Sequence, residues 1–317
     1  MIHLLFTGGT ISMTRDPRAG GNVPTHGGRQ LVEFTEGLER ISPYRIEDWS
    51  RIPACHMGPD RLWELRERTR EVMETGGVRG IVITHGTDTM EETAYLLART
   101  LNPLIPVAIT GAMRTSSDDA WDGPRNLLDA ARVAADPMSA GRGAMVVFAG
   151  KVLGGLQAVK THASALEAFG APHGTALGRV EDGEVQYVTA VMPARAHAPL
   201  APAGLTARVA LISMVIGDRG ELLDLARPLH DGLVLVSFGM GNTPPGAVPA
   251  VQRWLDEGKP VVLSSRCAQG QVGAAYAFDG GGSRLVEMGV LLAGPRTPSQ
   301  ARMELTIALS AGAGYGE

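Results

Sequence analysis

Two threonine hydroxyls occupy similar places in the sequence, each directly after a short apolar run. Thr10 lies just beyond the apolar residues 2–6, and Thr87 lies just beyond the run at 81–83. A threonine hydroxyl is a poor nucleophile at neutral pH and needs a neighbouring group that takes its proton. Asp88, which follows Thr87 directly, is a candidate for that role. The two hydroxyls, from separate parts of the chain, predict one nucleophilic site.

Tight turns precede both threonines. Gly8 and Gly9 come before Thr10, and Gly86 comes before Thr87, so the backbone can turn sharply there and approach a ligand closely. In an open α/β sheet, ligands bind just outside the carboxyl ends of the strands, where both threonines are expected. Backbone N–H groups at such strand ends are natural donors to an oxyanion. The sequence therefore predicts a ligand site at this edge of a sheet.

A helix is predicted immediately after the second threonine. The stretch 90–101 is long and helix-prone, and Asp88 followed by Glu91 fits a capping box, which predicts Asp88 as the N-cap residue. A purely structural interpretation stays open, because Asp88 alone is as often only a helix cap, and Thr87 only a turn hydroxyl.

The two stretches together resemble the paired signatures of the bacterial-type L-asparaginase family, whose members hydrolyse side-chain amides. The signatures read Thr7-Gly8-Gly9-Thr10-Ile11 and Thr84-His85-Gly86-Thr87-Asp88-Thr89-Met90-Glu91-Glu92-Thr93-Ala94. Further blocks that resemble the family follow in family order at residues 109–114, 122–127, 159–161, 238–242 and 264–266. The resemblance therefore covers nearly the whole chain.

The resemblance implies a catalytic role for Thr10, Thr87, Asp88 and Lys160. By this resemblance Thr10 attacks the amide carbon to give an acyl-enzyme, ammonia leaves, and water from the Thr87 side releases the acid. Thr87, Asp88 and Lys160 would form a hydroxyl–carboxylate–amine cluster, although Lys160 by itself would be interpreted as a solvated surface charge. Which threonine acts at which step stays open. The residues implied to contact the substrate are Gly9, Gly86, Ala54, Cys55, Ala112, through its backbone carbonyl, and Asn242.

One departure from the family concerns the segment that follows Thr10. Residues 13–28 are rich in glycine and lack apolar periodicity, which predicts a mobile loop that closes over the substrate. The family pairs a tyrosine of this loop with the first threonine, but the segment contains none, and Val23 stands near the expected place. His26 is the candidate replacement.

A second group of departures affects recognition of the amino-acid end of asparagine. Ala54 and Cys55 stand where the family has a serine and another polar residue, and Pro244 replaces a polar residue near Asn242. Each lost donor to an α-carboxylate forgoes about 1.5–3 kcal/mol. L-Asparagine is the expected substrate, and the alternative is a different or substituted small amide, with Cys55, His56 or His173 lining the site.

Two functions of other classes stay open. A branch of the family forms amidotransferase subunits that pass ammonia to a partner, but such a subunit would be expected to carry a long N-terminal extension, for which Met1-Ile2 leaves no room. The chain could also be a non-catalytic binding protein, given the missing tyrosine. The intact set of Thr10, Thr87, Asp88 and Lys160 argues against this second alternative.

Alternating strand and helix signals predict two α/β domains. A larger domain with a doubly wound, mostly parallel sheet is expected over residues 1–191, a proline-rich linker over 192–206, and a smaller parallel α/β domain over 207–317. Helices are predicted at 30–41, from 58 onward and near 299–310. The glycines at 280–282 predict a turn that does not open a helix.

Composition narrows the classes of partner and cofactor. The 317 residues carry a net charge of -4 with a pI near 6.1, so nucleic acid is not expected as a partner. No apolar run reaches the roughly 20 residues of a membrane span, and the N-terminus leaves no room for a signal peptide. Cys55 and Cys267 are expected as free thiols in a reducing cytoplasm.

The eight histidines are scattered without zinc-site spacing, so no metal is expected, and no organic cofactor is expected either. The family resemblance implies a homotetramer built from two close dimers, in which the smaller domain completes a neighbouring subunit's site.

Overall fold

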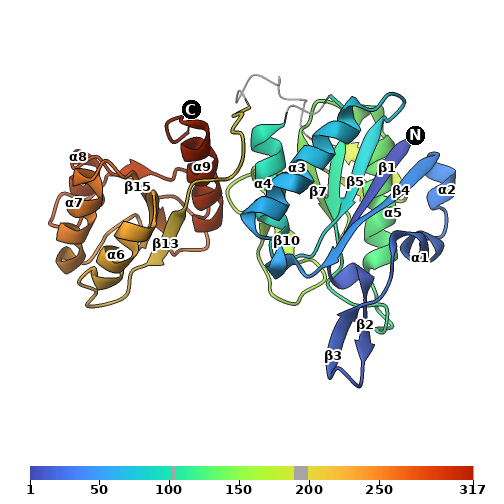
Figure 1. Ribbon diagram of the computed structural model, residues 1–317, viewed down its shortest axis with the longest axis horizontal. Helices are drawn as coiled ribbons and strands as arrows, with labels where there is room; N and C mark the ends of the chain where they lie inside the picture. The colour runs from blue at the N-terminus through green and yellow to red at the C-terminus, as the bar shows by residue number, and fades with distance from the viewer. Residues whose placement is uncertain (102–103, 189–198, 317) are drawn as a thin grey trace. The chain divides into compact units, whose positions relative to one another are not determined.

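The computed structural model describes all residues of the chain except 102–103, 189–198 and 317. The chain divides into two compact units, residues 1–199 and 200–317. Each unit is an α/β fold with its own sheet and its own hydrophobic core (Figure 1). The predicted class of two α/β domains is confirmed. The proposed linker at 192–206 falls partly outside the described residues.

The first unit is built on an eight-stranded sheet with the order β12-β11-β8-β7-β6-β5-β1-β4. The five strands from β7 to β4 run parallel, whereas β8, β11 and β12 add antiparallel pairs. Their bounds are β1 Ile2–Gly8, β4 Tyr44–Ile52, β5 Gly80–Thr84, β6 Val107–Thr110, β7 Ala144–Phe148, β8 Lys151–Gly154, β11 Gly178–Glu181 and β12 Glu184–Tyr187. The mostly parallel sheet is as predicted.

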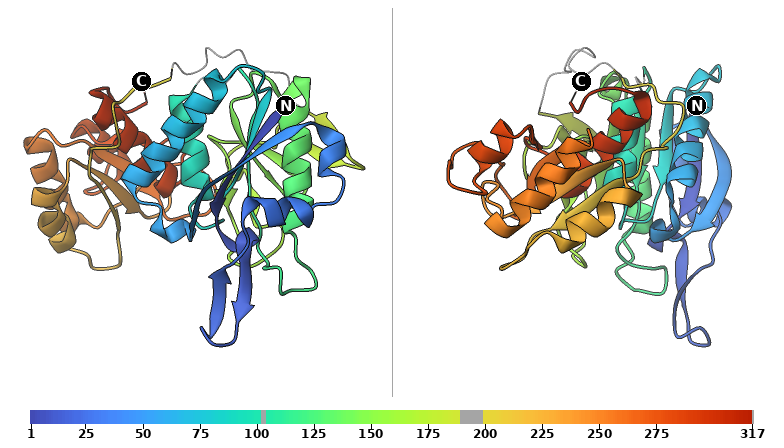
Figure 2. Two further views of the ribbon diagram at one scale, coloured as in Figure 1. Left: turned by 45° about the vertical axis from the view of Figure 1, so that its right-hand side comes forward. Right: turned by 60° about the vertical axis from the view of Figure 1, so that its left-hand side comes forward.

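Helices cover both faces of this sheet (Figures 1 and 2). Successive side chains of β1 point to opposite faces of the sheet, so Leu4 packs in one buried cluster and Leu5 in the other. The Leu4 cluster includes residues of α1, α2 and α5, and the Leu5 cluster includes residues of α3 and α4. The helices are α1 Gly28–Glu33, α2 Leu38–Ile41, α3 Pro59–Glu74, α4 Met90–Thr100 and α5 Gly123–Ala135. The sheet is therefore doubly wound.

One prediction near the N-terminus is wrong, and a second segment there contains strands that were not predicted. The helix predicted at 30–41 is broken, because Gly37 adopts a φ of +86° between α1 and α2. The segment 13–28, predicted as a mobile loop, contains a β-hairpin in which β2 Met13–Asp16 pairs with β3 Gly21–Pro24. The hairpin projects beyond the end of the sheet (Figure 1). Its turn is stabilised because the Asp16 carboxylate accepts hydrogen bonds from the backbone N–H groups of Arg18 and Ala19.

The second unit contains a four-stranded parallel sheet with the order β13-β14-β15-β16. Its core surrounds Trp254, whose indole donates to the Leu223 carbonyl. The elements are β13 Val209–Ser213, α6 Glu221–Ala226, β14 Gly232–Ser237, α7 Val248–Asp256, β15 Val261–Ser265, α8 Gly282–Glu287, β16 Leu291–Leu292 and α9 Pro298–Ala311. Contrary to the prediction, the glycines at 280–282 do open a helix, because Gly281 is the N-cap of α8.

Short elements complete the chain. The two-residue strands β9 Val159–Lys160 and β10 Phe169–Gly170 pair with each other. The 3-10 helices are Thr10–Ser12, Ala54–His56, Pro137–Ser139, Arg227–Leu229 and Pro245–Ala247.

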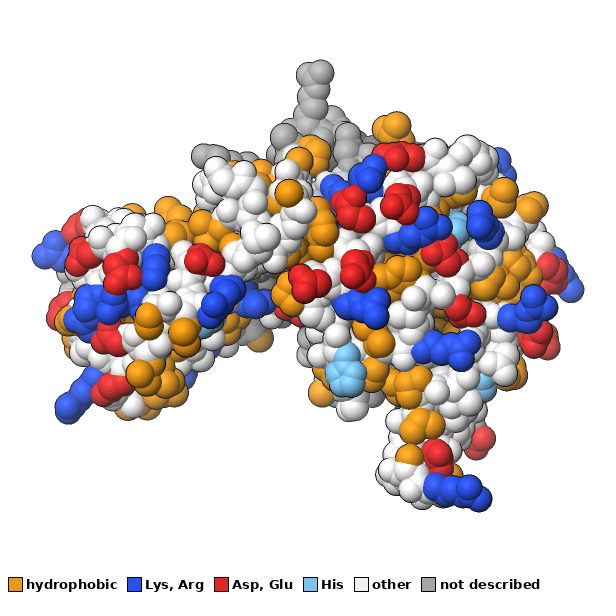
Figure 3. Space-filling model, viewed as in Figure 1, with side chains coloured by type: hydrophobic (Ala, Val, Ile, Leu, Met, Phe, Trp, Pro, Cys, Tyr) orange, Lys and Arg blue, Asp and Glu red, His pale blue; other side chains and the backbone are white. Residues whose placement is uncertain are grey.

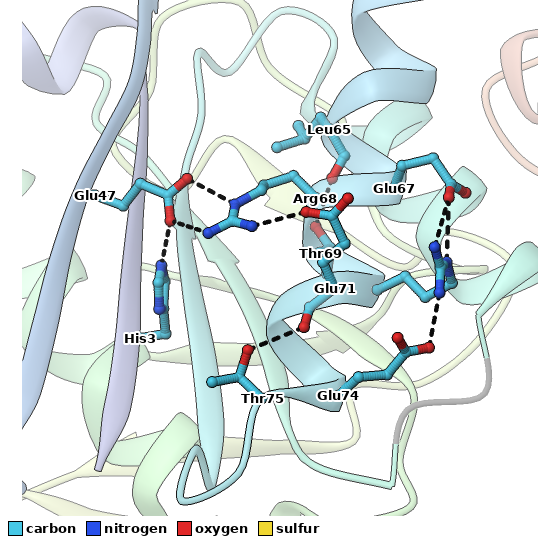
Figure 4. Close-up of polar contacts among 10 residues, drawn as sticks. His3, Glu47, Leu65, Glu67, Arg68, Thr69, Glu71, Glu74 and Thr75 are labelled. Atoms are coloured by element: carbon cyan, nitrogen blue, oxygen red, sulfur yellow. Dashed lines mark hydrogen bonds and ion pairs between the residues drawn. The ribbon is translucent and has the colours of Figure 1, made fainter.

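The edge strand β4 is held to α3 by an ionic network (Figure 4). The Glu47 carboxylate accepts from both Nε and Nη2 of Arg68, at 2.8 and 2.9 Å, and from Nε2 of His3 at 2.8 Å. The Arg68 guanidinium holds the pKa of Glu47 below its ordinary value. Elsewhere, basic and acidic side chains are interspersed on the face shown in Figure 3. The network fixes the outermost strand beside the one that leads to Thr10.

Candidate active site

The carboxyl ends of three neighbouring strands lie at one level. Phe6 of β1 is level with Thr84 of β5, and Thr84 is level with Thr110 of β6. The turns that follow these three strands therefore leave the sheet at the same edge. The predicted site residues of these turns are Gly9, Thr10, Gly86, Thr87, Asp88 and Ala112.

The backbones of the first two turns are in direct contact. A Cβ atom placed on Gly9 would lie 2.4 Å from the Cα atom of Gly86, and Gly9 has a φ of +84°, which favours glycine. A Cβ atom on Gly86 would lie 2.7 Å from the Cβ atom of Ala54. Gly9, Gly86 and Ala54 are thus brought together. Thr10 and Thr87 each follow one of the two touching glycines.

Lys160 joins Thr87 and Asp88. Its Nζ donates to the Thr87 hydroxyl at 3.0 Å and to Oδ1 of Asp88 at 2.7 Å. The Thr87 residue is buried, the Lys160 side chain is 16% exposed, and the Asp88 side chain is 67% exposed. The largely buried amine thus lies between a buried hydroxyl and a solvent-exposed carboxylate. The structure brings the hydroxyl, the carboxylate and the amine together.

Asp88 does not cap the helix after it. The N-cap of α4 is Thr89, whose hydroxyl donates to the Ala54 carbonyl at 3.1 Å. The Asp88 carboxylate pairs with Lys160 instead, and Glu91 accepts a hydrogen bond from the Lys160 backbone N–H at 2.6 Å. The capping-box prediction is therefore wrong, because both carboxylates interact with the strand that carries the lysine.

His85 is a further residue of this turn, to which the sequence analysis assigned no role. Its ring is fully buried, and burial lowers its pKa, which favours the neutral form. Nδ1 lies 2.8 Å from the Gly86 carbonyl, which can only accept, so Nδ1 carries the proton and Nε2 accepts from the Thr93 hydroxyl at 3.0 Å. The imidazole ties the turn before Thr87 to the second turn of α4.

Two side chains of the α5 region stabilise the turn after β6. The Asp122 carboxylate accepts from the backbone N–H groups of Met113 and Arg114, at 2.9–3.1 Å. The Asn126 amide donates to the Gly111 carbonyl at 3.0 Å. Ala112 is fully buried between these contacts. Its backbone position is therefore fixed at the same edge as Thr10 and Thr87.

Thr10 begins a 3-10 helix and is partly exposed. The Ser12 hydroxyl donates to the Gly9 carbonyl at 2.9 Å, which stabilises the turn that carries Thr10. Val23 lies on β3 opposite Thr14. His26, the candidate replacement for the missing tyrosine, directs Nε2 to the Ser116 hydroxyl at 2.8 Å, and no hydrogen bond joins it to Thr10 within the described residues.

The part of the hairpin next to its turn borders a cavity of about 610 Å³. The three segments that line it continue those carrying Thr10, Ala112 and Lys160. The lining residues are Arg15, Gly21, Asn22, Met113, Arg114, Thr115, Ser117, Asp118 and Ser164. The Arg15 backbone N–H donates to the Ser117 hydroxyl at 2.9 Å, which joins the hairpin to the β6–α5 loop.

The two remaining residues predicted to contact the substrate, Cys55 and Asn242, lie in different units of the chain. Cys55 is exposed in the 3-10 helix next to Ala54, and both Cys55 and Cys267 are free thiols as predicted. Asn242 belongs to the second unit, at a tight turn closed by its backbone bonds to Phe238. Its Oδ1 is buried and has no hydrogen-bond partner in the described part of the chain.

Neither a metal site nor a membrane span is found in the part of the chain that the structure describes. Nowhere among those residues do three or more His, Cys, Asp and Glu side chains gather in a way that could hold a metal ion. No described helix has both the length and the apolar character needed to cross a membrane.

Two family models match the two parts of the chain. The N-terminal asparaginase family model matches residues 1–192, and the glutaminase/asparaginase C-terminal domain model matches residues 208–317. A probable L-asparaginase of Deinococcus radiodurans is 36% identical over 98% of this chain and 94% of that protein. L-asparaginase 2 of Escherichia coli is 32% identical over 98% of this chain and 88% of that protein.

A solved structure also covers both units. The crystal structure of a probable cytoplasmic L-asparaginase from Campylobacter jejuni superimposes with a TM-score of 0.84 at 29% identity, over 98% of this chain and 94% of that chain. The likeness extends from the paired glycine turns to the closing helix α9. The chain is a member of the asparaginase family of amidohydrolases.

Proposed function

We propose that this protein hydrolyses the side-chain amide of L-asparagine to L-aspartate and ammonia, with Thr10 as the nucleophile. The observation that carries the proposal is the contact of Lys160 Nζ with both the Thr87 hydroxyl and the Asp88 carboxylate. The names of the relatives supply the substrate, since those from Deinococcus radiodurans and Escherichia coli are called L-asparaginases.

The chemistry divides into two steps. The Thr10 hydroxyl oxygen bonds to the amide carbon, the carbon–nitrogen bond breaks, and ammonia leaves with a proton that came from the hydroxyl. Water then attacks the ester, which frees Thr10 and the carboxylic acid. Backbone N–H groups of the turns at Gly9 and Gly86 are the candidate donors to the oxyanion of both tetrahedral states.

The Thr87 cluster can move one proton without a change of net charge. As the Thr87 hydroxyl gives its proton to Nζ of Lys160, Nζ passes one of its own to Asp88. The ammonium remains beside the oxygen that has become negative and stabilises it. A water molecule on that side could be activated by the same relay, so the order of the two threonines is left to experiment.

A different or substituted small amide is the alternative substrate. The Ala54 side chain cannot donate a hydrogen bond, and the cavity beside the hairpin provides space beyond the three turns. Both features would suit an amide that is larger than asparagine or that lacks its α-carboxylate.

The test is ammonia release from L-asparagine, D-asparagine, L-glutamine, N-substituted asparagines (by loss of the substituent amine) and simple amides without an α-carboxylate. The purified protein is compared with Thr10→Ala and Lys160→Ala. The proposal expects L-asparagine to be the best substrate and both variants to lose most of the activity. If another amide is preferred, the alternative holds, and if no amide reacts, the protein is a binding homologue.

We also propose a homotetramer, a dimer of dimers in which Asn242 completes a neighbouring subunit's site. The family resemblance supports this proposal, and Asn242 lies at a tight turn of the second unit. A protein that is monomeric by light scattering and fully active at the same concentration would contradict it. The free Cys55 and Cys267 agree with a proposed cytoplasmic location, which fractionation would test.

A further inference from the structure

The backbone of Lys160 is bound by a carboxylate of the helix that begins beside Thr87. The Lys160 N–H donates to Oε2 of Glu91 at 2.6 Å, a short charge-assisted hydrogen bond. Glu91 is the second residue of α4, and Thr87 and Asp88 lie in the turn that leads into this helix. One side chain therefore connects the element that carries the amine with the element that carries the hydroxyl and the carboxylate.

Strand β9 is short, and the residue after it, Thr161, donates its backbone N–H to the Ala168 carbonyl at 2.8 Å. The strand contains only Val159 and Lys160, and it pairs with the equally short β10. The residues directly after it, 161–164, are exposed. A lysine side chain has four rotatable carbon–carbon bonds, so the place that Nζ can reach depends on where the backbone is held.

We propose that Glu91 is a positioning residue for Lys160. Its carboxylate fixes the backbone of β9 against the first turn of α4 and so keeps Nζ within hydrogen-bond distance of Thr87 and Asp88. Glu91 acts through Lys160 and does not touch the substrate. The kinetic test of this inference rests on the proposed amidase function. A second test, the chemical labelling of lysines, needs no enzymatic activity.

The kinetic test uses Glu91→Ala, Glu91→Gln and Glu92→Ala. Glu91→Ala removes the acceptor and should lower kcat by about 10- to 100-fold with a smaller change in KM, because a displacement of about 1 Å can cost this much. Glu91→Gln retains an acceptor oxygen and should recover most of the activity. Glu92→Ala is the matched control, because Glu92 is the other acidic residue in the first turn of α4.

A double-mutant cycle separates positioning from a general structural effect. Once Lys160→Met has removed the amine, adding Glu91→Ala should change the residual kcat by no more than about twofold. An equal loss in the presence and absence of the amine would overturn the proposal. So would equal losses from Glu91→Ala and Glu91→Gln, or from Glu91→Ala and Glu92→Ala.

The chemical test exploits the scarcity of lysine in this chain, which contains only Lys151, Lys160 and Lys259. Trace acetylation with acetic anhydride, read by mass spectrometry, gives the relative reactivity of all three in one sample. In Glu91→Ala the labelling of Lys160 should change several-fold relative to Lys151 and Lys259. In Glu91→Gln and Glu92→Ala the ratios should stay as in the wild type.

The two tests distinguish failure of this inference from failure of the proposed function. If the wild type hydrolyses no amide but Lys160 labelling changes only in Glu91→Ala, the positioning role stands and the asparaginase proposal fails. If hydrolysis is normal and Lys160 labelling is unchanged in Glu91→Ala, the positioning role is overturned. Thermal unfolding of every variant verifies that the comparison concerns folded protein.

Discussion

Gly9 and Gly86 touch backbone to backbone at the point where the two threonine-bearing turns converge. A Cβ atom on Gly9 would approach the Cα atom of Gly86 to 2.4 Å, closer than any folded chain tolerates. The separation of Thr10 and Thr87 is thus set by two residues without side chains. Any substituent here would push the two turns apart before it altered the chemistry.

The contact of Gly86 with Ala54 predicts a pair of substitutions that partly compensate each other. Gly86→Ala should lower the free energy of unfolding by about 1–3 kcal/mol, because its Cβ would lie 2.7 Å from the Cβ atom of Ala54. Adding Ala54→Gly removes that atom but leaves the Ala54 nitrogen at 3.1 Å, so the recovery should be partial. Urea denaturation of both single variants and the double variant measures this. Losses that simply add would contradict the contact.

Lys160→Met should lower kcat by a factor on the order of 10²–10⁴, because the proton relay loses its central group. Asp88→Asn should cause a comparable loss, and the double variant should be little worse than either single one, since the residues act as a unit. The matched control is Lys151→Met, whose amine pairs with the exposed Glu167 at 2.9 Å. Steady-state kinetics with the best amide substrate gives kcat for the two single variants, the double variant and the control.

Ala54→Ser combined with Cys55→Gln tests substrate recognition. If these positions face the α-carboxylate, two restored donors should raise kcat/KM for L-asparagine by about 10-fold or more, which corresponds to about 1.5 kcal/mol. An amide without an α-carboxylate should gain nothing and serves as the internal reference. Equal gains for both substrates would place these residues away from the carboxylate.

Glu47→Gln should weaken the attachment of the edge strand and lower the free energy of unfolding at neutral pH by about 1–2 kcal/mol. The pKa of Glu47 is lowered, first by the hydrogen bond from Arg68, so its contribution is present above the ordinary pKa of 4.5 and is lost as the pH falls through the folded value. The difference between wild type and variant should therefore shrink on acidification. Denaturation curves over a pH series provide the measurement.

The parallel strands could be predicted because they are buried on both faces. Runs such as 81–83 and 233–236 are continuously apolar and β-branched or aliphatic, which between turn residues is typical of a strand buried on both faces. The edge strand β4 could not be predicted, because none of its residues is fully buried and it carries charges such as Arg45 and Glu47. Its placement depends on the long-range pairing with β1, which local patterns do not contain.

The site was predictable in its composition and less so in its connections. The glycine–threonine turns could be recognised from the residues, but Lys160 entered only through the family resemblance. Asp88 and Glu91 have the spacing of a capping box, and the structure uses both carboxylates for Lys160, which lies about 70 residues further along the chain. Local spacing favours the local partner. The contact of Asp88 with Lys160 was therefore implied only by the resemblance, and the contact of Glu91 with Lys160 was not predicted.

Cys55 provides a chemical reporter at the rim of the site. It is exposed in the 3-10 helix whose first residue, Ala54, touches the turn before Thr87, while the other thiol belongs to the second unit. Cys267→Ser would leave a single alkylation target. The rate at which iodoacetamide consumes it, with and without an amide, would then report site occupancy for ligands that are bound but never turned over.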